Sequence, residues 1–329
     1  MNKFKIILIL LIILTPFAAV KVSGVLNKYL IVAQTSAVDN GLNFELLRQI
    51  ADQNKLNNNG QNSSEVLSNN LISTSSAFSA NFECNAEISA RLALVRFLSQ
   101  NNKVFELNAD NRWPLASITK LMTAIVSLEN MDSEKSVALT DQMISVEEGV
   151  GGFKAGEIFK AKDLLKALLL ISSNGAAEAL AQDFGKEKFI DLMNQKAKEL
   201  HLNETAFFDP SGLSARNQST PNDILKLMDY LRDNHKEILK ITIQKSGSIF
   251  ELNSNTRRML SNINEFAGEP NFLGGKTGFT DEAQGNLVSL FTVQQGLSPA
   301  FKNEPVVIVV LGSHDRFGDT KKLLNCINP

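Results

Sequence analysis

Ser117 and Lys120 are the residues whose types and spacing most directly suggest chemistry. They open a run, residues 119–128, in which nothing breaks a helix and apolar residues recur at helical spacing. Residues three apart share one face of a helix, with Cβ atoms roughly 5–6 Å apart, so the hydroxyl and the amine would meet. A serine hydroxyl needs a base to take its proton, and a lysine can be that base only when burial or another positive charge keeps it neutral. The alternative for the same letters is a helix cap followed by a solvated lysine.

Two further short motifs could supply what this pair lacks. Ser172-Ser173-Asn174 follows an apolar helical stretch, and Lys276-Thr277-Gly278 follows two glycines and leads into a predicted strand. Ser-x-x-Lys and Lys-Thr-Gly each occur once in the chain, and only one Ser-x-Asn copy lies between them. This order of motifs is typical of penicillin-binding proteins and related β-lactamases.

The composition is that of a globular protein with a substantial core. The chain has 329 residues, of which 43% are hydrophobic and 21% charged, enough for one large domain or two ordinary ones. The net charge of -2, without a basic stripe, argues against a nucleic-acid partner. The histidines are scattered without ligand spacing and two cysteines are too few for a zinc site, so we expect neither a metal nor a cofactor.

The N-terminus has the layout of an export signal. Residues 1–5 are short and basic, and residues 6–20 are almost entirely apolar. The apolar run is shorter than the ~20 residues that a comfortable membrane span needs. Residues 1–26 are therefore predicted to be a cleaved signal peptide or a retained membrane anchor. Both alternatives place the rest of the chain outside the cytoplasm, either anchored at the cell membrane or secreted.

Residues 27–79 are predicted to be a flexible linker. Residues 54–76 are crowded with asparagine and serine, and such a stretch buries too little apolar surface to offset the entropy of ordering it. The functional interpretation is a tether that holds residues 80–329, the predicted catalytic domain, away from a membrane. The alternative is a tolerated disordered insert.

Strand patterns lie at both ends of the remaining chain, and helical patterns lie between them. Strands are predicted over residues 88–98, 103–107, 249–253, a segment through Lys276, 286–293 and 305–311. Helices are predicted over residues 117–130, 161–171, 175–184, 186–200, 221–233 and 317–326, with Thr220 as an N-cap. This order predicts an α+β fold: a five-stranded antiparallel sheet built from both chain ends, flanked by helices, with an inserted all-helical lobe.

The motifs and their surroundings resemble a known enzyme family. Residues 114–124, 156–170, 209–213 and 274–280 are similar to sequence blocks of the serine-type D-alanyl-D-alanine carboxypeptidases, the small penicillin-binding proteins. The resemblance implies a β-lactamase/transpeptidase-like fold. It also implies an enzyme of cell-wall biogenesis that removes the terminal D-alanine from peptidoglycan stem pentapeptides through an acyl-enzyme. β-Lactam antibiotics would acylate the same serine as covalent inhibitors.

The resemblance assigns roles to the motif residues. The predicted catalytic residues are Ser117 as nucleophile, Lys120 as base, Ser172 as proton shuttle and Asn174 as a partner of Lys120 and of the substrate amide. The predicted substrate-binding residues are Lys276, Thr277, Gly278 and Phe279. Lys276 would supply the second positive charge that frees Lys120 as a base, and with Thr277 it would bind the peptide's free carboxylate. The backbone N–H groups of Ser117 and Phe279 would form the oxyanion hole.

Other functions share these motifs. A β-lactamase also needs a glutamate for the deacylating water, and its usual Glu-x-x-Leu-Asn context is absent, since Glu204 is followed by Thr205-Ala206-Phe207-Phe208. A wall-binding or β-lactam-sensing protein would be acylated without turnover. Its support is Gly175, which follows Asn174 where the family usually carries an aspartate. Endopeptidases that cut cross-links also occur in the family, and the sequence does not exclude that activity.

The two cysteines lie near opposite ends of the predicted domain. Cys84 precedes the first predicted strand, and Cys326 lies in the last predicted helix. In a sheet built from both chain ends the two could be neighbours, and an exported protein could oxidise them to a disulfide. The alternative is a pair of free thiols.

Overall fold

The computed structural model describes residues 84–98, 103–146, 150–293 and 303–327. All of them belong to the structural unit Asn81–Pro329. The predicted signal or anchor at residues 1–26 and the predicted linker at residues 27–79 lie outside the described residues, so the domain boundaries stay predictions. Within the described ranges, no helix is both long enough and apolar enough to span a membrane.

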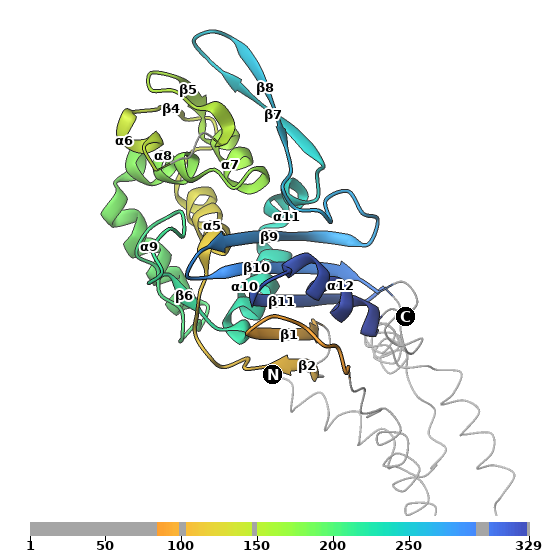
Figure 1. The fold of residues 1–329 in the computed structure, drawn as a ribbon. Coiled ribbons are helices and arrows are strands. Elements are labelled where there is room, and N and C mark those ends of the chain that lie inside the picture. Colours follow the sequence, from red (N-terminus) through yellow and green to blue (C-terminus); the bar gives the residue numbers. More distant parts are fainter. Residues whose placement is uncertain (1–83, 99–102, 147–149, 294–302, 328–329) are drawn as a thin grey trace, which may run out of the picture. The chain divides into compact units, whose positions relative to one another are not determined.

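A five-stranded sheet is built from both ends of the described chain (Figure 1). The early part contributes β1 (Leu92–Phe97) and β2 (Lys103–Leu107). The late part contributes β9 (Phe272–Thr280), β10 (Gln284–Thr292) and β11 (Pro305–Ser313). The order is β2-β1-β11-β10-β9, and every neighbouring pair is antiparallel. The predicted α+β class and its antiparallel sheet are confirmed.

The central strand β11 shows why the sheet has a core on each face. Within residues 306–311, the odd-numbered side chains pack in a cluster shared with the helical region. The even-numbered side chains pack in a second cluster with α12 (Arg316–Ile327). Successive side chains of a strand point to opposite faces. A continuous apolar run therefore serves two cores, with helices on both sides of the sheet (Figure 1).

The helices of the middle region follow the sequence prediction to within a few residues at their ends. They are α5 (Lys120–Asn130), α7 (Ala161–Leu170), α8 (Asn174–Phe184), α9 (Lys186–Glu199) and α10 (Pro221–Asn234). The predicted N-cap of α10 is confirmed, because Oγ1 of Thr220 accepts a hydrogen bond from the N–H of Asp223 at 3.1 Å. That cap satisfies one of the N–H groups that a helix start leaves unpaired.

Several short elements were not predicted from the sequence. The helical ones are α6 (Asp141–Ile144), η2 (Val150–Gly152) and α11 (Lys236–Thr242). The first turn of the helix predicted over residues 117–130 is a separate 3₁₀ helix, η1 (Ala116–Thr119). The short strand pairs are β3 (Trp113–Pro114) with β6 (Gln218–Ser219), and β4 (Ser136–Ala138) with β5 (Ile158–Lys160). Elements this short carry too little periodicity to stand out in a sequence.

A two-stranded hairpin projects from the helical region (Figure 1). Its strands are β7 (Ser246–Glu251), which the sequence placed slightly later, and β8 (Thr256–Ser261), which was not predicted. Glu251 is buried at the end of β7 and accepts hydrogen bonds from the N–H groups of Ile158 at 2.9 Å and Asn253 at 3.1 Å. The bond from Ile158, with others from Ser254, lowers the pKa of Glu251 to about 2.

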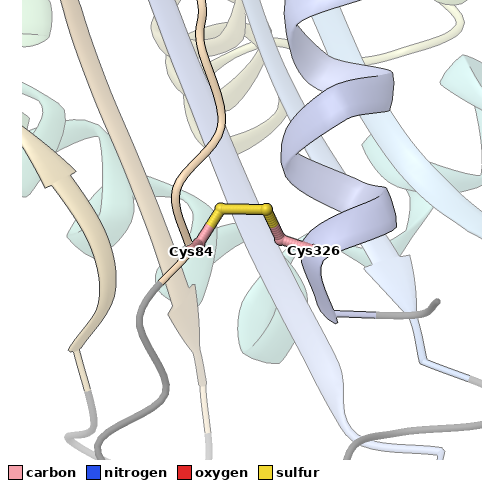
Figure 2. Close-up of a disulfide and its surroundings, with 2 residues drawn as sticks. All are labelled: Cys84 and Cys326. Carbon is pink, nitrogen blue, oxygen red and sulfur yellow. A yellow bond between two sulfur atoms is a disulfide. The ribbon is translucent and has the colours of Figure 1, made fainter.

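Cys84 and Cys326 form a disulfide, with Cα atoms 5.5 Å apart (Figure 2). The bond joins the segment before β1 to the last turn of α12, as hypothesised from the sheet's construction. A disulfide is typical of proteins outside the reducing cytoplasm, so this feature agrees with the expected export of the chain.

Candidate active site

Ser117 and Lys120 meet because a tight turn precedes the main helix. Ser117 lies in the 3₁₀ helix η1, and Lys120 is the first residue of α5. Side chains at i and i+3 eclipse one another in a 3₁₀ helix. Oγ of Ser117 and Nζ of Lys120 are accordingly 2.8 Å apart. The predicted hydroxyl–amine pair is therefore present in the structure, and the solvated-lysine alternative is wrong because Lys120 is fully buried.

The environment of Lys120 fits either protonation state. Its Nζ donates to Oδ1 of Asn174 and to the carbonyl oxygen of Ser211, both at 2.7 Å. Those two atoms can only accept, whereas the third partner, the Ser117 hydroxyl, can accept or donate. An ammonium would donate all three bonds, and a neutral amine would donate two and accept the hydroxyl proton. Proton transfer from Ser117 to Lys120 therefore needs no rearrangement of heavy atoms.

The tripeptide Ser172-Ser173-Asn174 connects the two lysines. Ser172 has a positive φ of 60° and lies between α7 and α8. Oγ of Ser173 caps α8 by accepting the N–H of Ala176 at 3.0 Å, which leaves Ser172 and Asn174 to face the lysines. Asn174 contacts Lys120, as above, and Oγ of Ser172 lies 2.9 Å from Nζ of Lys276.

Lys276 reaches the same place from the edge strand β9. It is 1% exposed, and its Nζ also donates to the carbonyl oxygen of Thr277 at 2.9 Å. Burial lowers the pKa of Lys276 well below its ordinary value, and the positive charges of Lys120 and Arg316 lower it further. Because charge repulsion is mutual, each protonated amine disfavours protonation of the other. The two amines are therefore close enough to interact, and the role of Lys120 as the freed base stays a prediction.

Two glycines allow the chain to close around the nucleophile. Ala116, directly before Ser117, has a strained φ of 47°. A Cβ atom on Gly212 would lie 1.9 Å from the carbonyl oxygen of Ala116, and one on Gly278 would lie 3.1 Å from the backbone nitrogen of Ser117. The loop with Gly212 and the strand with Gly278 therefore pack directly against the turn that carries the nucleophile.

The loop that supplies the Ser211 carbonyl is held by its own side chains. Oδ1 of Asp209 accepts the backbone N–H groups of Ser211 at 2.7 Å and Gly212 at 2.6 Å. Nδ2 of Asn217 donates to Oγ1 of Thr119 at 3.2 Å. The backbone carbonyl oxygen of Asn217 accepts the N–H of Leu115 at 2.8 Å. In the sequence, residues 209–213 resemble a block of the family, but no role was predicted for them. Its contact with Lys120 makes it part of the site.

Arg316 is the site residue that sequence analysis missed. It opens α12, and its Nη1 donates to the carbonyl oxygen of Gly278 at 3.2 Å. Burial lowers the pKa of its guanidinium, and its buried Nε has no hydrogen-bond partner among the described residues. A cation beside Lys276 indicates a site for an anionic group. The sequence held no signal beyond the position of an arginine at a helix start near the chain's end.

The predicted site residues are brought together from three separate parts of the chain. Ser117, Lys120, Ser172, Asn174 and Lys276 share the hydrogen bonds given above, and Gly278 lies against the backbone of Ser117. Thr277 is buried in β9, whereas the side chain of Phe279 is 59% exposed at the end of that strand. The geometry agrees with the expected roles, which stay predictions.

Comparison with known proteins identifies what this arrangement is similar to. Residues 79–314 match the family model described as D-alanyl-D-alanine carboxypeptidase, peptidase S11. A D-alanyl-D-alanine endopeptidase of Pseudomonas aeruginosa is 30% identical over 77% of this chain and 81% of its own length. A D-alanyl-D-alanine endopeptidase of Escherichia coli K12 is 31% identical over 72% of this chain and 76% of its own.

A solved structure shows the same fold. Penicillin-binding protein D2 from Listeria monocytogenes, in its ampicillin-bound form, is 28% identical with a TM-score of 0.61. The alignment covers 74% of this chain and 98% of that one. The five-stranded sheet and the helical region described above are thus those of a penicillin-binding protein fold.

Proposed function

Because this chain belongs to the D-alanyl-D-alanine carboxypeptidase family, we propose that it releases the terminal D-alanine from peptidoglycan stem peptides through an acyl-enzyme on Ser117. Family membership makes it a serine DD-peptidase, a hydrolase of peptidoglycan peptides. Within that class of enzymes, the activity that we propose is that of a carboxypeptidase. The observation that supports an acyl-enzyme on Ser117 is the 2.8 Å contact between its Oγ and an Nζ of Lys120 that two acceptor-only oxygens hold in place.

Acylation follows from that contact. Neutral Lys120 takes the hydroxyl proton as Oγ of Ser117 attacks the carbonyl carbon between the two D-alanines. The tetrahedral oxyanion is stabilised by the N–H groups of Ser117 and Phe279, and each such donor typically contributes ~10²–10³ in rate. Ser172, next to Lys276, passes a proton to the leaving amine. Water then hydrolyses the ester and restores Ser117.

The cationic side of the site would bind the substrate's free carboxylate. Lys276 and Thr277 are residues of β9, and Arg316 lies beside that strand through its hydrogen bond to the carbonyl of Gly278. β9 is an edge strand, so an extended peptide can align beside it by main-chain hydrogen bonds. This alignment would place the penultimate carbonyl at Ser117 and the terminal carboxylate at the cations.

A DD-endopeptidase is the second candidate, and the two relatives reported above favour it. Both are named D-alanyl-D-alanine endopeptidases and align over about three quarters of this chain. An endopeptidase cuts a cross-link, and a carboxypeptidase releases free D-alanine. The same nucleophile, base and carboxylate site serve either bond, so the substrate that the enzyme accepts decides between them.

The cellular compartment in which the enzyme acts is part of the same proposal. The substrate lies outside the cytoplasm and the Cys84–Cys326 disulfide agrees with an oxidising compartment. We infer that residues 1–26 deliver the chain there, as a cleaved signal or as a membrane anchor. The partners are peptidoglycan stem peptides and, as covalent inhibitors, β-lactams.

The test measures two products with the full-length chain. We expect D-alanine release from a diacyl-Lys-D-Ala-D-Ala peptide and, after penicillin treatment, a mass adduct mapped to Ser117. Ser117→Ala should abolish both, whereas Ser133→Ala, an exposed serine in a turn, should abolish neither. Cleavage of a cross-linked muropeptide dimer without D-alanine release would establish the endopeptidase instead. Rapid turnover of a chromogenic β-lactam would indicate a β-lactamase, and an adduct with no peptide cleavage would indicate a sensor.

A further inference from the structure

The entry segment, residues 84–89, is attached to α12 at three points. The first is the disulfide between Cys84 and Cys326, which Figure 2 shows bridging the incoming chain and the helix. The second is Nζ of Lys322, which donates to the carbonyl oxygen of Glu87 at 2.8 Å. The third joins Ser89 to Asp319. The attachment points on the helix are three and four residues apart, so they share one face of α12.

Asp319 makes the most contacts of the three attachment points. It is 2% exposed and lies in the first turn of α12, where a negative charge is favoured by the helix dipole. Both carboxylate oxygens accept the backbone N–H of Ser89 at 3.0 Å, and Oδ2 also accepts the Ser89 hydroxyl at 2.8 Å. Oδ2 further accepts the hydroxyl of Ser313, the last residue of β11, at 2.7 Å. One carboxylate thus ties together the entry segment, the central strand and the start of the helix.

Arg316 lies one turn before Asp319 and depends on its helix for orientation. Its Cβ would be 3.4 Å from a Cβ built on Gly285 of β10, so the side chain starts directly over the sheet. Its guanidinium donates one hydrogen bond, to the carbonyl of Gly278, and lies over the ring of Phe317, the next residue of the helix, 5.1 Å from the ring centroid. No carboxylate among the described residues forms an ion pair with it. Both contacts depend on where the first turn of the helix directs this long side chain.

We propose that Asp319, supported by the entry segment, is a positioning residue that aims Arg316 at the substrate carboxylate. The proposal rests on the proposed function for the contact between Arg316 and substrate. Loss of the Asp319 carboxylate frees the junction between β11 and α12, and the guanidinium then spends less time at the end of β9. The effect should fall on substrates that carry a free carboxylate and spare those that lack one.

The experiment compares two peptides that differ only at that group. One ends in D-Ala-D-Ala with a free carboxylate, and the other ends in its amide. The quantity followed is the ratio of their kcat/KM values. Arg316→Ala should lower the ratio about tenfold or more, since a hydrogen bond between charged groups contributes that much. Asp319→Ala should lower it several-fold, chiefly through a higher KM for the carboxylate peptide.

A double-variant cycle separates positioning from general destabilisation. If Asp319 acts through Arg316, the variant with both substitutions has the same ratio as Arg316→Ala alone. The matched control is Asp163→Ala, which removes another buried first-turn aspartate that pairs with Lys166 and lies 3.4 Å from the N–H of Phe250. It should lower thermal stability without changing the ratio. Ser89→Ala, a milder change, should move the ratio in the same direction as Asp319→Ala.

The outcomes are distinct. An unchanged ratio in both Asp319→Ala and Ser89→Ala, or effects of Asp319 and Arg316 that multiply in the double variant, would overturn the positioning role. If Asp319→Ala does not fold, Ser89→Ala alone decides. A wild-type enzyme that neither cleaves the peptide nor is acylated by penicillin would contradict the proposed function itself.

Discussion

The two lysines of the site come from regions that hold them in different ways. Lys120 begins a helix of the helical region and is fixed by three short contacts, one of them to a serine three residues away. Lys276 lies on an edge strand of the sheet with one side-chain partner, and its pKa is lowered by burial first and then by the charges of Lys120 and Arg316. The helical region thus provides a nucleophile and base that are three residues apart, with two distant acceptors holding the base. The sheet provides the charges, which depend on the whole fold.

This difference predicts unequal losses when each lysine is replaced. Lys120→Met should lower kcat on the order of 10³-fold, because general-base catalysis contributes ~10²–10⁴ and no other amine contacts Ser117 in the described structure. Lys276→Met should lower kcat/KM less, about 10²-fold, with part of the loss in KM because this lysine also faces the carboxylate. Steady-state kinetics on the D-Ala-D-Ala peptide checks both. Equal losses confined to kcat would contradict the division of roles.

A second prediction tests how closely the loop with Gly212 approaches the turn that carries the nucleophile. Gly212→Ala should destabilise the fold by about 3 kcal/mol or more, because the new Cβ would lie 1.9 Å from the carbonyl oxygen of Ala116 in addition to the strain of its φ of 88°. Gly156→Ala is the matched control, with a φ of 84° and no atom within 4 Å of the new Cβ. It should cost only about 1 kcal/mol. Urea unfolding of both variants measures the difference, and similar losses would refute the close approach.

The lowered pKa of Lys276 predicts a pH dependence of stability. Without a bound carboxylate, and between that lowered pKa and the ordinary value of 10.5, the unfolded chain binds a proton that the folded chain does not; a bound carboxylate would favour the charged amine again. The free energy of unfolding should therefore gain from this group as pH rises through the window. Lys276→Met should remove that gain, and Lys120→Met should reduce it because one cause of the shift is gone. Parallel urea titrations from pH 7 to 9.5 would show it; identical slopes in all three proteins would contradict the repulsion.

The smallest effect is expected far from the lysines, in the hairpin β7–β8. Glu251 has its pKa lowered to about 2 by the backbone bond from Ile158 and the bonds from Ser254. Its stabilising contribution is complete above the ordinary value of 4.5 and is lost as pH falls toward 2. Glu251→Gln should flatten the stability profile in that range and leave the profile above pH 7 unchanged. Thermal unfolding midpoints at pH 2.5, 4.5 and 7 test this, and a parallel profile for both proteins would refute it.

The helical part of the site could be predicted from the sequence because its determinants are short-range. Ser117 and Lys120 are three residues apart, and the cap at Thr220 lies within its own turn. The sheet was also predictable, since β10 and β11 are long and mostly apolar. The pairing of Arg316 with Gly278 was not, because it joins residues 38 positions apart through the packing of a helix end on a sheet. The hairpin strand β8 was missed because charged and exposed residues interrupt its alternation.

The placement of β11 between β1 and β10 has a consequence for synthesis of the protein. The central strand of the sheet is among the last of the described elements, and its partner β1 is among the first. A chain in which β11 has not yet been synthesised has Ser117 and Lys120 but lacks the strand that joins β1 to β10. Pairing of strands this distant in sequence makes completion of the sheet slow compared with helix formation.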